Sequence, residues 1–274
     1  MAGCFCPGCE TFVADSGVTL VAVAPSSNTD AVFIRSVSAV LNKTPYDTRL
    51  LLAGDIPRIV ARYEITQMAE STVKRLRQLG LAALACRDSE LHRSSPGFRA
   101  QALEFGDKHV MCWDSGSHEK RLEQDDVFLI LEGKMETLVE VETSKRQSKF
   151  SLGRTLIAGG IPIWQKVDQK STARSVQVEH FVRLYDRKSS TPGVEILQHL
   201  MNYSFLGEKM TVSSLTNFGT VVLRLREAFP QAIFDDRLMK PLGATPGPSA
   251  VRQDADANCK LIYLFHSSGI PHKK

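Results

Sequence analysis

The chain has 274 residues, of which 43% are hydrophobic and 23% are charged, and its formal net charge is +4 at pH 7. This composition excludes a predominantly disordered chain, a coiled coil and the strongly basic character of many nucleic-acid-binding proteins. A chain of this length can bury a sizeable core and has room for two domains.

Two absences in the sequence bear on its location. The longest apolar runs, 18–25 and 156–164, reach about half of the ~20 residues that a helix needs to cross a bilayer. The N-terminus has neither the positive region nor the apolar region of ~7–15 residues that marks a secretory signal peptide. We therefore expect no membrane span and a cytoplasmic protein, with its cysteines in a reducing compartment.

Residues 1–17 form a tail that carries Cys4, Cys6 and Cys9. The pair Cys6 and Cys9 encloses Pro and Gly, and such a turn lets two thiolates face one tetrahedral zinc ion, with Cys4 as a third candidate ligand. Residues 4–9 therefore resemble half of a zinc ribbon.

The sequence has no second Cys-x-x-Cys or Cys-x-x-His, so a closed zinc site needs Cys86, Cys112, a distant histidine or another subunit. A zinc ion shared between subunits would make the chain a dimer. The alternatives are the remnant of a longer ribbon and an oxidisable tail. A redox role is not favoured, because that motif belongs at a helix N-terminus after a strand.

Residues 18–88 have the clearest secondary-structure pattern in the sequence, which predicts a β-α-α-α-β module. An apolar run ends before Pro25 and predicts a buried strand, and Gly80 is a typical helix C-cap. We expect the elements in this order: a strand over 18–23, a helix from Asp30 to Leu41, a short helix over 46–53, an extended link over 55–60, a helix from Thr66 to Leu79, and a strand over 81–86.

This order, with Ile34-Arg35, Ile59-Val60 and the run 76–80, resembles the C-terminal domain of the bacterial ribosomal stalk protein. The resemblance implies a small protein-interaction module in which Arg35 is the contact residue. Two departures argue against recruitment of translation GTPases: the segment 42–46 replaces the Gly- and Leu-rich joint of that family, and Ser38 replaces a second basic residue. The alternative is that Arg35 is simply a solvated helix residue.

Residues 89–97 are rich in Ser, Pro and Gly and predict a linker. Residues 98–242 predict a larger β-rich domain that ends in helices. Gly-Asp and Gly-Lys turns suggest a meander. The expected elements are strands over 100–105, 110–113, 126–132, 135–142, 156–164 and 176–185 and helices over 194–203 and 213–229. Strands before a final long helix resemble a bacterial pleckstrin-homology-type domain.

Residues 243–274 predict a disordered tail, with an added strand over 260–266 as an alternative.

An enzymatic alternative is a metal-dependent, nuclease-like hydrolase in the 98–242 domain, with Asp126, Glu140, Glu142 and Lys145 around a metal ion. Glu142 and Lys145 lie three residues apart, however, and so point to opposite faces of a strand, whereas that motif needs a spacing of two. We interpret these charges as solvent-facing residues on a sheet, and Asp235-Asp236 as a turn or a helix cap. The chain is therefore interpreted as non-catalytic.

The segment 145–188 is locally cationic, beginning with Lys145, Arg146 and Lys149. It is a candidate surface for an acidic partner or, as a second alternative, for anionic lipid or phosphate. Aromatic residues that stack on bases are scarce around it, so nucleic acid is disfavoured. The sequence thus predicts an α+β, two-domain binding or regulatory protein that acts through protein-protein contacts, with zinc as the candidate cofactor.

Overall fold

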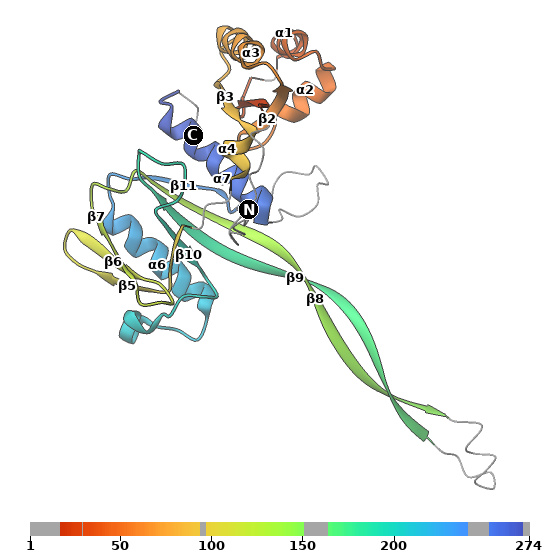
Figure 1. Ribbon diagram of the computed structural model, residues 1–274, viewed down its shortest axis with the longest axis vertical. Helices are drawn as coiled ribbons and strands as arrows, with labels where there is room; N and C mark the ends of the chain where they lie inside the picture. The colour runs from red at the N-terminus through yellow and green to blue at the C-terminus, as the bar shows by residue number, and fades with distance from the viewer. Residues whose placement is uncertain (1–16, 29, 94–96, 151–163, 241–251, 271–274) are drawn as a thin grey trace, which may run out of the picture.

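The computed structural model describes residues 17–28, 30–93, 97–150, 164–240 and 252–270 (Figure 1). It contains helices and three separate sheets, which confirms the predicted α+β class. No helix within these described ranges is both long and apolar enough to cross a membrane.

The first unit is a three-stranded antiparallel sheet in the order β2-β1-β3, with helices on one face. Its elements are β1 (Thr19–Val23), α1 (Ala31–Leu41), α2 (Pro45–Leu52), β2 (Arg58–Tyr63), α3 (Thr66–Gln78) and β3 (Ala83–Arg87). The segment predicted as an extended link is therefore a strand, β2, and it pairs with the free edge of β1. The module reads β-α-α-β-α-β and not β-α-α-α-β.

The ends of these helices follow from local chemistry. Thr44 accepts a hydrogen bond from the backbone N–H of Asp47, and Pro45 occupies the first helical position of α2, where a missing N–H costs nothing. Gly80 follows α3 with a φ of +86°, a left-handed conformation that glycine adopts without strain.

The central strand β1 is buried on both faces. Val21 and Val23 pack against α1, α2 and α3, whereas Leu20 and Ala22 pack against the C-terminal helix α7 (Arg252–Ser267). Because both faces are covered, the strand reads as a continuous apolar run and not as an alternating one.

Helix α7 corrects the prediction of a disordered tail over 243–274. Its residues Leu261 and Phe265 complete the core of the small module, and its residues Cys259 and Ile262 pack on the large sheet. Polar composition hid the helix, because Gln253, Asp254 and their neighbours follow a stretch rich in Pro and Gly. The last helix of the chain is thus sandwiched between the two units.

The predicted linker 89–97 also needs correction, because it includes most of a short helix, α4 (Asp88–His92). Leu91 of α4 is 1% exposed and belongs to the core beneath α7. Lys260 of α7 donates hydrogen bonds to the backbone carbonyls of Glu90 and Arg93, so α4 is attached directly to the C-terminal helix.

The large unit contains a five-stranded sheet in the order β11-β8-β9-β10-β4 and a three-stranded sheet in the order β5-β6-β7. Its elements are β4 (Phe98–Ala100), β5 (Ala102–Phe105), β6 (His109–Trp113), β7 (Glu119–Glu123), β8 (Leu129–Phe150), β9 (Trp164–Tyr185), β10 (Val194–Leu197), the 3-10 helix η1 (Ser204–Lys209), α6 (Ser214–Ala228) and β11 (Ile233–Leu238). Helix α6 begins after Ser213, whose side chain accepts from the Thr216 N–H, as its predicted position implies.

Three predictions for this unit are wrong. The strand predicted over 100–105 is split between two sheets, as β4 and β5. The segment predicted as a helix over 194–203 begins instead with strand β10, which pairs with β9 on one side and with β4 on the other. A short apolar run fits a buried strand as well as a helix. Gly133 is no turn, since β8 runs through it; a Cβ there would lie 2.5 Å from Cζ of Phe181. The strand predicted over 156–164 lies almost wholly outside the described residues.

Candidate functional site

A cavity of about 400 Å³ lies where the small module, β11 and α7 meet. The small module contributes Ser26 and Asp55 to its lining. Strand β11 contributes Asp235 and Arg237, and α7 contributes His266. The interpretation of Asp235 as part of a turn or cap is therefore corrected, because it lies within a strand and its side chain is 4% exposed.

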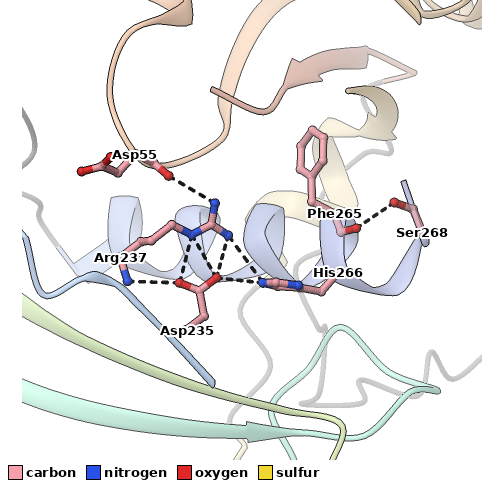
Figure 2. A network of polar contacts seen from close by, with 6 residues as sticks. All are labelled: Asp55, Asp235, Arg237, Phe265, His266 and Ser268. Carbon is pink, nitrogen blue, oxygen red and sulfur yellow. Dashed lines mark hydrogen bonds and ion pairs between the residues drawn. The ribbon is translucent and has the colours of Figure 1, made fainter. Parts of the chain in front are cut away.

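Asp235 is held by two partners (Figure 2). The Nε of Arg237 lies 3.0 Å from both carboxylate oxygens, and its Nη2 lies 2.6 Å from Oδ2. His266 Nε2 lies 2.8 Å from the same Oδ2. Arg237 also donates through Nη1 to the backbone carbonyl of Asp55, at 3.2 Å, and so reaches from β11 to the small module.

Burial alone would raise the pKa of Asp235, but hydrogen bonds from His266 and Arg237 outweigh that cost and hold the pKa well below its usual range. The carboxylate is therefore ionised at neutral pH. Both of its oxygens are engaged, so it acts as a fixed anion that ties three parts of the chain together. We call the set Asp55, Asp235, Arg237 and His266 the clasp.

A second buried network joins α7 to the large sheet. Arg183 of β9 donates to Glu195 of β10 at 2.8 Å and also to Asp256 of α7, and Arg99 donates to the other oxygen of Glu195 at 2.9 Å. Desolvation would raise the pKa of Glu195, but the charge and hydrogen bonds of Arg183 and Arg99 lower it overall. Arg183 lies within the cationic segment 145–188, yet its side chain is only 5% exposed, so it is not part of a surface for an acidic partner.

The most distinctive surface of the chain is the outer part of β8 and β9. Strand β11 stops pairing with β8 at Gly133, and β10 stops pairing with β9 at Phe181. The two long strands continue together to the pair Phe150 and Trp164, and Figure 1 shows them extending away from every other labelled element. We call residues 134–150 and 164–180 the arm.

The arm contains the basic residues singled out from the sequence. Lys145, Arg146 and Lys149 lie on its outer half, in β8, opposite Gln169, Asp168 and Gln165 of β9. Arg35, the contact residue implied by the stalk-domain resemblance, lies elsewhere, on α1. Its side chain is exposed, and its Nε donates to the carbonyl of Ala31 at 3.2 Å.

The structure does not bring the proposed hydrolase carboxylates together. Asp126 precedes β8 and accepts a hydrogen bond from the backbone N–H of Glu123. Glu140 lies eleven residues beyond the start of β8, which is about 36 Å along an extended strand. These positions are far too distant to share one metal ion. In the described part of the chain, no group of three or more His, Cys, Asp or Glu side chains is placed to hold one.

The zinc candidates Cys4, Cys6 and Cys9 lie outside the described residues. Two cysteines considered as further ligands, Cys86 and Cys112, are both buried. Desolvation raises the pKa of Cys86 to about 11 and that of Cys112 to about 12, which disfavours the thiolate that zinc binds. A zinc site completed by either of them would therefore require these strands to open.

Sequence reasoning missed His266 and misassigned Asp235. The two residues are 31 positions apart and lie on different elements, so only tertiary packing joins them. A weak signal existed in Asp235-x-Arg237, because spacing of two places both side chains on one face of a strand.

Comparison with protein-family models, with curated proteins and with solved structures finds no match for this chain.

Proposed function

We propose that the chain is a non-catalytic binding or regulatory protein that acts through protein-protein contacts, with the arm as its main contact surface. The observation that supports this is the loss of outer strand neighbours beyond Gly133 and Phe181. A two-stranded ribbon is marginally stable in water on its own, and its strands have unpaired edges that favour pairing with another chain.

The length of the arm supports a binding role over a structural one. Seventeen residues of β8 lie beyond Gly133, which is about 56 Å of extended chain. At the base of the arm, Met135 of β8 belongs to the core, whereas Val178 of β9 is 39% exposed.

The small module offers a second contact surface. Its resemblance to the ribosomal stalk domain implies protein interaction, and α1 presents the exposed residues Val32 and Arg35. This proposal gives α1 a role that does not depend on the arm.

The proposal is tested with an arm-shortened chain, in which Asn-Gly replaces residues 139–175 as a two-residue hairpin turn. The full and shortened chains are each immobilised and exposed to an extract of the source cells, and bound proteins are quantified by mass spectrometry. We expect at least one protein to bind the full chain and to be lost with the arm. It is then purified and its affinity measured by calorimetry.

The matched control is Arg35→Ala in the full chain, which leaves the arm intact. Identical bound proteins on the full and shortened chains would contradict the assignment of the arm. If Arg35→Ala abolishes the binding of a protein and arm shortening does not, the contact surface lies on α1 and not on the arm.

A further inference from the structure

The charges of the arm are divided into two blocks along its length. The inner half comprises the eight pairs from Met135 and Glu179 to Glu142 and Thr172, and the outer half comprises the eight pairs from Thr143 and Ser171 to Phe150 and Trp164. Between Gly133 and the outer half the charged residues are Lys134, Glu136, Glu140, Glu142, Glu179 and Arg174, four acidic and two basic, and the Glu179 carboxylate is paired with His199 at 2.7 Å. Those of the outer half are Lys145, Arg146, Lys149, Lys166, Lys170 and Asp168. The inner half is thus acidic and the outer half basic.

The two blocks cannot neutralise each other within one chain. Each half spans about 26 Å of strand, whereas the Debye length is about 8 Å at physiological ionic strength. Their separation along the two strands places an acidic stretch and a basic stretch one after the other.

A partner that fits this arrangement must carry the same two blocks in the opposite order. A second arm laid antiparallel meets the condition, because a two-fold axis through the middle of the arm places each inner half on the outer half of the other chain. Such an isologous contact is the commonest kind in homodimers. A parallel alignment would place like charges together.

We infer that two copies of this chain associate through antiparallel pairing of their arms, with the acidic inner half of each against the basic outer half of the other. The inference rests on the proposed function and names the partner of the same surface. A nucleic acid or an anionic membrane fits less well, because the acidic inner half would be repelled from it.

The test uses two charge-reversed variants of the full chain. One carries Arg146→Glu, Lys166→Glu and Lys170→Glu, which makes both halves acidic. These three positions are in register with the strand face that holds Glu136, Glu140 and Glu142. The other carries Glu136→Lys, Glu140→Lys and Glu142→Lys, which makes both halves basic. A matched control carries Lys43→Glu, Lys74→Glu and Arg75→Glu, three exposed reversals on the small module. Mass and association are measured by sedimentation velocity.

The unaltered chain and the control should sediment as dimers at about 0.15 M salt and dissociate towards monomers at about 1 M, where the Debye length falls to about 3 Å. Each reversed variant alone should dimerise about 100-fold more weakly or worse. A mixture of the two should form a heterodimer, because their arms are then complementary along the whole length.

Three outcomes would overturn the inference: a monomeric unaltered chain at about 100 µM, dimers that the reversals leave intact, or two monomeric variants that stay apart when mixed. A monomeric chain whose arm still captures another protein from extract would refute self-pairing and leave the proposed function standing. A monomeric chain without arm-dependent capture would refute both.

Discussion

Asp235 shows how one buried carboxylate can hold three parts of a chain together. Its charge is compensated by Arg237 on the same strand and by His266 on α7, and Arg237 continues to the backbone of Asp55. Removing one member of a buried charge pair leaves the other uncompensated, which costs far more than losing a surface pair.

We therefore expect Asp235→Asn to lower the free energy of unfolding by about 3 kcal/mol at neutral pH. Urea unfolding followed by circular dichroism measures this value, with Asp236→Asn as the adjacent exposed control. An equal decrease in the free energy of unfolding in the two variants would contradict the stabilising role of the clasp.

The same carboxylate predicts a pH dependence. Its pKa is lower in the folded chain than its ordinary value of 3.8, so its stabilising contribution is complete above that value and declines as pH falls below it. The stability difference between the unaltered chain and Asp235→Asn should therefore be smaller at about pH 3 than at pH 7. A difference that stays constant over this range would exclude an ionised, hydrogen-bonded Asp235.

Two glycines should respond to the same substitution with opposite signs. Gly133→Ala places a Cβ 2.5 Å from Phe181 and 2.9 Å from Leu238, and we expect it to cost about 1–3 kcal/mol through overpacking. Gly219→Ala meets nothing within 4 Å and lies inside α6, where alanine is the better helix former by about 1 kcal/mol. Melting temperatures measure both, and a shift of the same sign would refute the packing argument.

At the scale of elements, α7 is the part on which both units depend. Phe265 is fully buried between α7 and the sheet face of β1 and β3. Its truncation should leave a cavity on the small module, whereas Met68 of α3 is 53% exposed and can be truncated with little loss.

We expect Phe265→Ala to lower the free energy of unfolding by about 3–5 kcal/mol, and Met68→Ala by less than about 0.5 kcal/mol. Denaturant unfolding monitored at several wavelengths gives both values. A small loss in Phe265→Ala would mean that the module retains its fold without α7.

The sequence predicts elements well where local signals agree. Helix α6 has its Ser213 cap and an apolar stripe, and α3 has its stripe and Gly80, so both were predicted within one or two residues of their ends. Gly133 and the segment from Val194 were predicted wrongly. A glycine can mark a turn or a close approach of a neighbouring side chain to the backbone, and a short apolar run fits either a strand or a helix.

The candidate functional surfaces could also be predicted only in part from the sequence. The basic residues Lys145, Arg146 and Lys149 are visible in the sequence, but their isolation on a projecting arm is not, because it follows from where β10 and β11 end. The clasp could not be foreseen, since neither Asp235 nor His266 has a local pattern that points to the other.

At the scale of the whole molecule, the arm joins the body at its base, where Met135 belongs to the core and Glu179 is paired with His199. The arm-shortened chain retains every residue of the described core clusters. We therefore expect its melting temperature, measured by calorimetry at high salt, to stay within about 2 °C of that of the full chain. A large decrease would mean that the arm packs against the body.

The position of α7 has a consequence for synthesis. The strands β1 and β3 leave the ribosome early, but the helix that covers their second face is translated about 180 residues after Arg87. At 5–20 residues per second, the module waits roughly 9–36 s with Leu20, Ala22 and Leu84 uncovered. The nascent chain therefore displays an apolar sheet face for most of its translation, and molecular chaperones that shield such faces should matter most for this protein before its last helix emerges.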